Sequence, residues 1–433
     1  DPDTDAVICR NPLRETWEDL PLSERVYTPT VGADLLRETK QSPEEAALKH
    51  ALSETSEKAR IAVGEGKIEN DALKLTETGL SALYPGDLNV TKSILESFRK
   101  CPMQHYLQYS LHLDDNRAAA FDPSNVGTLV HFVLETYLKE LTEKGIDPET
   151  VSREDRYGKV KEIADNYLTQ INGGKITDRQ SHFYDKLIRS TDAVTESVFE
   201  DVGASGFKPK FFELGMEDGD PDLPEPLYVT APDGTRISVY GVIDRVDTFR
   251  DGNRVFVRVV DYKTGKDHFS PSDLKKGKNL QMFLYLRAVT ESERFRKQLG
   301  AGEGEVVLPA GVLYLNTKLD TEVVSCPAEA AAAFKSAQVS SGMCSSDPAV
   351  IGATPPNRLP FRLTKFNTVH GTDIKKSFNE ETWGEVCRTV SDAVAELATG
   401  IKSGNISAAA QKSGGTVPCA YCSFAPICRS AKA

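Results

Sequence analysis

Two runs of β-branched and aromatic residues constrain the fold most strongly, because they can pair as a hairpin. The runs span residues 236–249 and 254–262, and the Arg-Asp-Gly-Asn segment between them is typical of a tight turn. Further strands are predicted at 208–216 and 310–316. Amphipathic periodicity and helix-forming residues predict helices at 33–62, 91–111 (reset at Pro102), 124–144, 153–171, 179–202, 272–299 and 379–402. This mixture predicts an α/β fold.

Composition narrows the class of protein. The chain has 433 residues, of which 64 are acidic and 52 basic, giving a net charge of −12. This balance argues against a basic module that simply coats nucleic acid, because such binding depends on Lys and Arg. No apolar run approaches the 18 residues that a membrane-spanning helix requires. The sequence also lacks a Gly-x4-Gly-Lys-Ser/Thr phosphate loop, so we expect no ATP hydrolysis by that route.

The chemistry-bearing residues lie on the predicted hairpin. Asp261 and Lys263 are two residues apart on one strand and should face the same side, where Asp244 on the partner strand can join them. Two carboxylates at the end of an apolar hairpin are costly unless a cation offsets their charge, and oxygen ligands suit Mg²⁺ or Mn²⁺. The alternative is an Asp–Lys pair on an exposed strand edge. Glu213, on the strand at 208–216, is expected to face water, with a role as an additional acid that supports the site as the alternative.

Two further patterns accompany the hairpin. Gly127-x3-His131-x3-Glu135 lies on the predicted helix 124–144, and Gln281-x3-Tyr285 places two polar side chains one turn apart on another helix. Each pattern has a simpler explanation, since His131 can be a core histidine and Gln281 and Tyr285 can be an ordinary helix face. Their order along the chain together with the hairpin is the specific signal.

With these four elements in this order, the sequence resembles the RecB-like branch of the PD-(D/E)xK nuclease superfamily over residues 91–430. The resemblance implies a restriction-endonuclease-like core, which is a central mixed sheet flanked by helices. It also implies a divalent-metal site, with Mg²⁺ as the expected ion and Mn²⁺ as an alternative. The implied ligands are the side chains of His131, Asp244 and Asp261 and the backbone carbonyl of Tyr262.

The same resemblance implies the remaining catalytic residues. Lys263 corresponds to the catalytic lysine of the family. Gln281 and Tyr285 correspond to a pair that orients this lysine and contacts the substrate strand. The nominal proline before the first aspartate is absent, since Val242-Ile243 stands there. The implied reaction is metal-dependent, exonuclease-type hydrolysis of DNA.

Cysteines form a second constellation. Cys419, Cys422 and Cys428 crowd the C-terminus, and Cys101, followed by Pro102, is the best candidate for a fourth ligand. The resemblance implies that these four hold a 4Fe–4S cluster that joins the two ends of the nuclease domain. A structural Zn²⁺ on four thiolates is the alternative. The remaining cysteines are expected to be ordinary thiols: Cys9, Cys326, Cys344 and Cys387.

Within that branch, segments 93–102 and 127–131 resemble the nuclease domain of the AddB component of bacterial AddAB helicase–nucleases. We therefore expect residues 91–433 to form the nuclease domain and 1–90 to continue from an upstream helicase-like region. The implied setting is double-strand-break repair in the bacterial cytoplasm, with single-stranded DNA and an AddA-like subunit as partners and no membrane. A stand-alone RecB-like exonuclease and a non-catalytic DNA-end-binding scaffold are the alternatives. Residues 326–360 and 403–433 are expected to be loops.

Overall fold

The fold is described from a computed structural model. It covers residues 73–113, 125–172, 178–263, 269–317, 340–411, 419 and 422–428. The chain divides into two compact units, Asp1–Leu73 and Lys74–Ala433, and the structure describes the second. The helices expected at 33–62 lie outside the described residues.

A six-stranded mixed sheet forms the centre of this unit. Its hairpin is made of β5 (Val242–Asp251) and β6 (Arg254–Lys263), which pair antiparallel around Gly252 at φ 59°, as the turn sequence predicted. On the other side β6 pairs parallel with β7 (Val306–Asn316). The full order is β2 (Lys208–Gly215), β5, β6, β7, β8 (Ser341–Ser345) and β9 (Ser377–Phe378).

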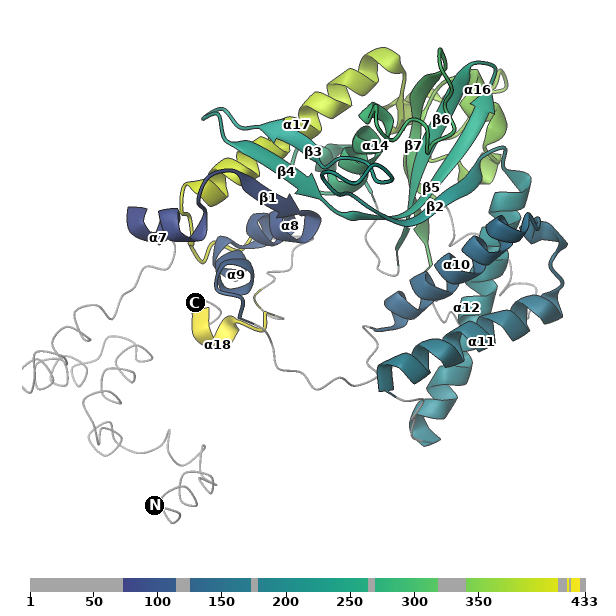
Figure 1. The fold of residues 1–433 in the computed structure, drawn as a ribbon, viewed down its shortest axis with the longest axis horizontal. Coiled ribbons are helices and arrows are strands. Elements are labelled where there is room, and N and C mark those ends of the chain that lie inside the picture. The colour runs from purple at the N-terminus through teal and green to yellow at the C-terminus, as the bar shows by residue number, and fades with distance from the viewer. Residues whose placement is uncertain are drawn as a thin grey trace, which may run out of the picture. The chain divides into compact units, whose positions relative to one another are not determined.

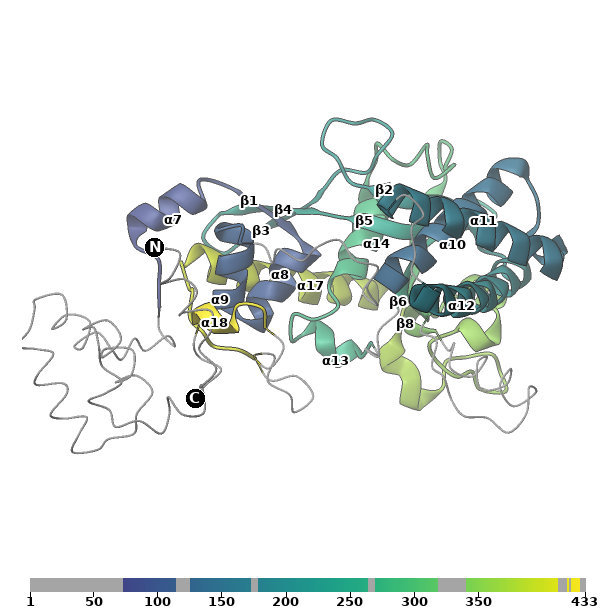
Figure 2. The same ribbon diagram turned by 90° about the horizontal axis from the view of Figure 1, so that it is seen from below.

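Helices cover both faces of the sheet (Figures 1 and 2). Val260 and Tyr262 of β6 pack into the cluster formed by α10 (Asn125–Lys144), α11 (Arg153–Asn172) and α12 (Asp178–Ala204). The alternating residues Val257 and Val259 pack instead against α14 (Gln281–Glu291) and α17 (Glu380–Lys402). The period-two alternation of the strand therefore decides which side chains of β6 face each helical layer.

The helices with clear periodicity occur where the sequence predicted them. α10, α11, α12 and α17 each begin and end within about two residues of the predicted bounds, as boundary signals allow. Gly145 follows α10 at φ 63°, a left-handed conformation that ends the helix. Asn379 caps α17 through a reciprocal hydrogen-bond pair with Thr382. None of the described helices is both long and apolar enough to cross a membrane.

The N-terminal part of the unit contains a strand that the sequence did not reveal. After α7 (Glu77–Leu83), β1 (Leu88–Thr91) pairs parallel with β4 (Arg236–Tyr240), and β3 (Leu227–Thr230) completes a second sheet in the order β1-β4-β3. The domain boundary expected between residues 90 and 91 falls inside β1. Residues 74–90 belong to the same compact unit as the six-stranded sheet.

α8 (Lys92–Lys100) follows directly after β1, with Thr91 as its N-cap. The chain continues through α9 (Pro102–His105) and a π-helical turn at Tyr106–Ser110, so the reset predicted at Pro102 is confirmed. Proline suits the first position of a helix because its missing N–H has no partner there.

Two predicted elements are wrong because glycine and asparagine interrupt them. The single strand predicted at 236–249 breaks at Gly241 into β4 and β5, which belong to different sheets. The helix predicted at 272–299 is only α13 (Pro271–Leu274) and α14. Between them Gly277 and Asn279 adopt left-handed conformations, at φ 68° and 55°, that a helix excludes.

The predicted loops contain more structure than expected. Within 326–360, the described residues include β8 and α16 (Pro348–Ala353), and only 326–339 lie outside the described residues. β8 is short and small-residue-rich, so its strand pairing with β7 comes from tertiary context rather than from propensity. The tail 403–433 is loop-like where it is described, apart from the short helix α18 (Ala425–Cys428).

Candidate active site

Two carboxylates and a lysine lie at the open end of the hairpin, where β5 begins and β6 ends. The antiparallel ladder ends at the pair Arg245 and Val260, so Asp244 and Asp261 are the next residues beyond it on the two strands. Asp261 is only 6% exposed, and its Oδ2 lies 2.6 Å from the Nζ of Lys263. The spacing therefore placed Asp261 and Lys263 side by side, as predicted.

The peptide of Tyr262 connects this pair to the other predicted ligands. Its N–H donates to Oδ2 of Asp244 at 2.9 Å, and its carbonyl accepts a hydrogen bond from Nε2 of His131 at 2.7 Å. Nδ1 of His131 lies 3.4 Å from Oδ2 of Asp244. The structure thus brings His131, from the first half of α10, to Asp244 and the Tyr262 peptide, whereas Asp261 does not join them in a set of ligand atoms within 4.8 Å.

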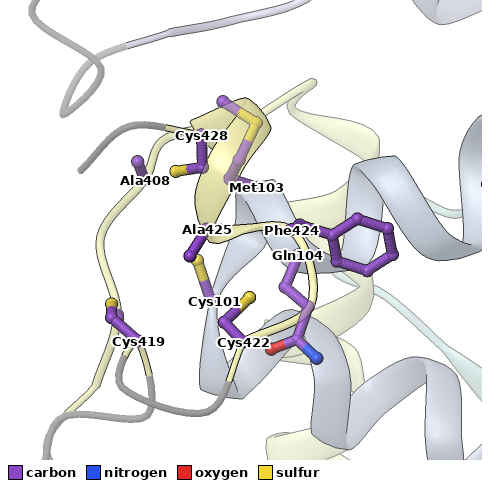
Figure 3. A pocket seen from close by; sticks show the side chains of 10 residues that line it. Cys101, Met103, Gln104, Ala408, Cys419, Cys422, Phe424, Ala425 and Cys428 are labelled. Atoms are coloured by element: carbon purple, nitrogen blue, oxygen red, sulfur yellow. The ribbon is translucent and has the colours of Figure 1, made fainter. Parts of the chain in front are cut away.

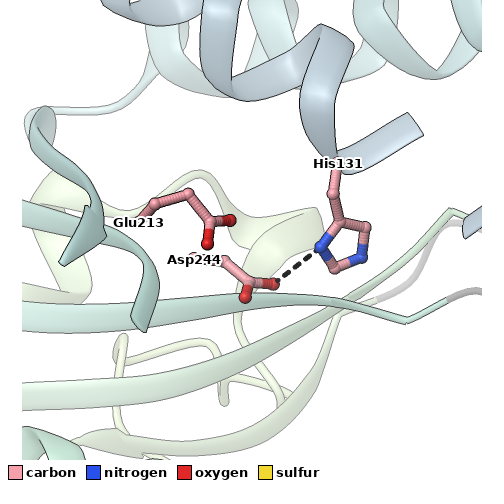
Figure 4. A group of neighbouring side chains, drawn as sticks. All are labelled: His131, Glu213 and Asp244. Atoms are coloured by element: carbon pink, nitrogen blue, oxygen red, sulfur yellow. Dashed lines mark ion pairs between the residues drawn. The ribbon is translucent and has the colours of Figure 1, made fainter. Parts of the chain in front are cut away.

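Glu213 also belongs to this group, although its side chain is exposed as the sequence predicted. Among the described residues, only His131, Glu213 and Asp244 form a set of three potential metal ligands whose atoms all lie within 4.8 Å (Figure 4). Glu213 has a φ of 45° within β2. A left-handed residue other than glycine is rare in a strand, and such conformations concentrate at functional sites. No periodicity in the sequence indicates this backbone conformation, so the reading of Glu213 as a residue that only faces water is incomplete.

The electrostatics of the group favour a cation. Burial, followed by repulsion from Asp261, raises the pKa of Asp244. Partial desolvation of the carboxyl group and the charge of Asp244 likewise raise the pKa of Glu213. Carboxylates held together in this way resist ionisation unless a positive charge offsets them. Carboxylate oxygens, one imidazole and the Tyr262 carbonyl are donors that fit Mg²⁺ or Mn²⁺.

The side chain of Tyr262 lies on the face of the sheet that α10 covers, where a buried charge network holds it. Nη1 of Arg245 donates to the Tyr262 hydroxyl at 2.8 Å, and Arg245 also donates twice to Asp247, at 2.8 and 3.0 Å. Arg258 donates to the same carboxylate at 2.8 Å. Arg245 and Asp247 are fully buried and Arg258 nearly so, and breaking such a network by removing one charge is strongly destabilising. It therefore fixes the end of β6.

The predicted pair Gln281 and Tyr285 is also formed. Nε2 of Gln281 donates to the Tyr285 hydroxyl at 2.9 Å, and α14 begins at Gln281. Burial raises the pKa of Tyr285 to about 12, so the phenol stays protonated at neutral pH. The ring lies against Gly241, where a Cβ would overlap its hydroxyl. The glycine that separates β4 from β5 thus also makes room for Tyr285.

The four predicted cysteine ligands line one pocket (Figure 3). Cys101 caps the C-terminus of α8, and Cys419, Cys422 and Cys428 come from the tail. None of the four is in a disulfide, and burial raises the pKa of the Cys101 thiol.

The other cysteines do not join this pocket where they are described. Cys344 is buried on β8, where its thiol donates to the carbonyl of Ala310, and Cys387 lies on α17. Both remain ordinary free thiols. Cys9 and Cys326 lie outside the described residues.

Replacing Gly241 with alanine should destabilise the protein through Tyr285. The new Cβ would force the tyrosine out of its place, which should lower the free energy of unfolding by about 1–3 kcal/mol. The measurement is urea denaturation of Gly241→Ala in the wild-type and Tyr285→Ala backgrounds. In the second background the cost should largely disappear. An equal cost in both backgrounds would contradict this account.

Comparison with known proteins agrees with this geometry. The family model of the PD-(D/E)XK nuclease superfamily matches residues 89–429. The chain is 27% identical over 371 residues to the B component of the ATP-dependent helicase/deoxyribonuclease of Clostridium acetobutylicum, covering 82% of this chain and 31% of that protein. It is 28% identical to the corresponding component from Acetivibrio thermocellus, covering 83% and 32%. The chain thus spans about a third of the length of these relatives. It belongs to the PD-(D/E)XK nuclease superfamily.

Proposed function

We propose that this chain is the nuclease part of a helicase–nuclease component and hydrolyses DNA phosphodiesters with a divalent metal ion. The observation that carries the proposal is the convergence of Asp244, Asp261 and Lys263 on the peptide of Tyr262, together with His131. The names of the relatives, which contain both helicase and deoxyribonuclease, support DNA as the substrate.

Different residues of the chain would bind the metal ion and stabilise charge on the substrate. His131, Asp244, Asp261 and the carbonyl of Tyr262 would hold Mg²⁺ or Mn²⁺, and Glu213 is close enough to contribute an oxygen. A bound divalent ion supplies polarisation of the phosphate and activation of water. Lys263 holds a positive charge beside Asp261, where it can orient an attacking water or stabilise negative charge on the phosphoryl group.

The wider setting is part of the same proposal. We infer exonuclease-type cleavage of a single strand delivered by a helicase partner, in the repair of DNA double-strand breaks. Two facts support this setting: the relatives are named as parts of a helicase, and this chain spans about a third of their length. The remaining two thirds of such proteins leave room for the helicase function.

Removing either half of the Asp261–Lys263 pair should abolish cleavage. Asp261→Ala and Lys263→Ala should each lower kcat by more than about 100-fold, because each removes a charge needed in the transition state. The measurement is cleavage of a labelled single-stranded oligonucleotide with Mg²⁺. Asp392→Ala and Lys139→Ala, on exposed faces of α17 and α10, are the matched controls and should cleave normally.

The same assay tests the metal. EDTA should stop cleavage, and added Mg²⁺ or Mn²⁺ should restore it. Ca²⁺ should support it poorly, because Ca²⁺ takes more ligands at longer distances. Cleavage by Asp261→Ala near the wild-type rate would contradict the assigned site.

The cysteine pocket fits a 4Fe–4S cluster, and we propose that Cys101, Cys419, Cys422 and Cys428 hold it. Thiolates of a tetrahedral zinc site lie about 3.8 Å apart, given Zn–S bonds of about 2.3 Å. In the described part of the chain, no three cysteine sulfurs lie within 4.8 Å of one another, although the four share one pocket. A spacing wider than tetrahedral zinc needs supports the larger cluster. Its ligation would join α8 to the C-terminal tail.

Loss of one cluster ligand should therefore unfold the tail. Cys422→Ala should lose broad absorbance in the blue-violet region, melt at a lower temperature and become sensitive to protease near the C-terminus, since ligation closes a loop of several hundred residues. The measurements are an anaerobic spectrum with iron and sulfide analysis, thermal melting and limited proteolysis. Cys387→Ala is the control and should keep the absorbance. A Cys422→Ala protein that loses absorbance but melts like the wild type would contradict a structural cluster.

A further inference from the structure

A second lysine lies beside the catalytic lysine and comes from a distant part of the sequence. Lys92, the first residue of α8, lies close enough to Lys263 for the two side-chain charges to affect each other, and it lines a pocket with Gln281 and Tyr285. The neighbouring carboxylates are Glu96, one turn along α8, and Asp261. α8 thus adds a positive charge to a site that the hairpin and α10 otherwise build.

Two neighbouring ammonium groups repel one another, so placing both here is favourable only with anions nearby. Asp261 is already paired with Lys263, at 2.6 Å, and is also a potential metal ligand. Burial, followed by the charge of Lys263, lowers the pKa of Lys92. Glu96 is the remaining anion. Burial raises its pKa, which disfavours the negative charge that would balance the two lysines.

The surroundings of Lys92 indicate what it contacts. Lys92 and Glu96 line the same pocket as Gln281 and Tyr285. The first two come from α8 and the other two from α14, so this pocket lies between the two helices, and Lys92 connects it to Lys263. A substrate strand that contacts the Gln281–Tyr285 pair would therefore meet Lys92 as well.

We propose that Lys92 binds a backbone phosphate of the DNA strand, next to the phosphate that Lys263 serves. This inference rests on the proposed nuclease function and adds a substrate contact to it. An ammonium group binds a phosphate as a point charge, and a pair of them gives the strand an attractive position within a chain whose net charge is −12.

The position of α8 gives this contact a structural consequence. Lys92 begins the helix and Cys101 caps its other end, where the backbone N–H of Cys101 donates to the carbonyl of Ser97. Between them Leu95 and Phe98 anchor the helix in the core. The cysteine pocket therefore holds the helix that presents Lys92 to the substrate.

Lys92→Met tests the proposal in the full chain. The measurement is the affinity for a labelled single-stranded oligonucleotide in Ca²⁺, over a range of salt concentrations. Loss of one charge-assisted phosphate contact should raise Kd roughly tenfold and reduce the slope of log K against log salt by about 0.7. Lys100→Met makes the same charge change at the exposed other end of α8 and should stay within about twofold of the wild type.

Glu96→Gln separates phosphate binding from a simple ion pair within α8. If Lys92 binds phosphate, removing the neighbouring negative charge should leave affinity unchanged or increase it. If Lys92 only pairs with Glu96, both variants should weaken the protein alike, in thermal melting and in DNA affinity, and this would overturn the proposal. Lys92→Arg keeps the charge and should keep both affinity and salt slope.

The outcomes distinguish this inference from the proposed function. Suppose that the wild-type protein cleaves DNA and Asp261→Ala does not. If Lys92→Met then binds DNA with wild-type affinity and salt slope, only the assignment of Lys92 is overturned. Absence of metal-dependent cleavage by the wild-type protein would overturn the proposed function itself.

Discussion

The site depends on one peptide group, that of Tyr262. Its N–H holds Asp244 and its carbonyl holds His131, while its sequence neighbours supply Asp261 and Lys263. Displacing this peptide would release both Asp244 and His131. The Tyr262 side chain accepts a hydrogen bond from Arg245, which belongs to the buried charge network. Such outer contacts hold the groups that bind a metal in place.

Around this point the fold assembles residues from widely separated segments. α10 supplies His131 and β2 supplies Glu213, whereas α14 supplies the Gln281–Tyr285 pair. α8 adds Lys92 on the side of the sheet where α14 packs. Because α8 begins at Lys92 and is capped by Cys101, Lys92 and the cysteine pocket lie at the two ends of a single nine-residue helix. Disorder at the cysteines would reach the active site through this helix.

Local rules explain which parts of this arrangement the sequence predicts. The i, i+2 spacing of Asp261 and Lys263 and the turn around Gly252 define the hairpin, and long amphipathic stretches define helices such as α10. What escapes these rules depends on tertiary context. Glu213 lies at the site because its backbone is left-handed. Gly241 separates β4 from β5 and leaves space for the Tyr285 ring. β1 is a strand because it pairs with β4.

The central claim is that the Tyr262 peptide and its neighbours form one divalent-metal site. The most direct test is a crystal of the protein soaked in Mn²⁺ and measured at the manganese absorption edge. The account predicts an anomalous peak bonded to His131, Asp244 and Asp261 and to the carbonyl of Tyr262, at distances suited to oxygen and nitrogen ligands. A peak elsewhere, or an ordered site without a peak, would contradict it.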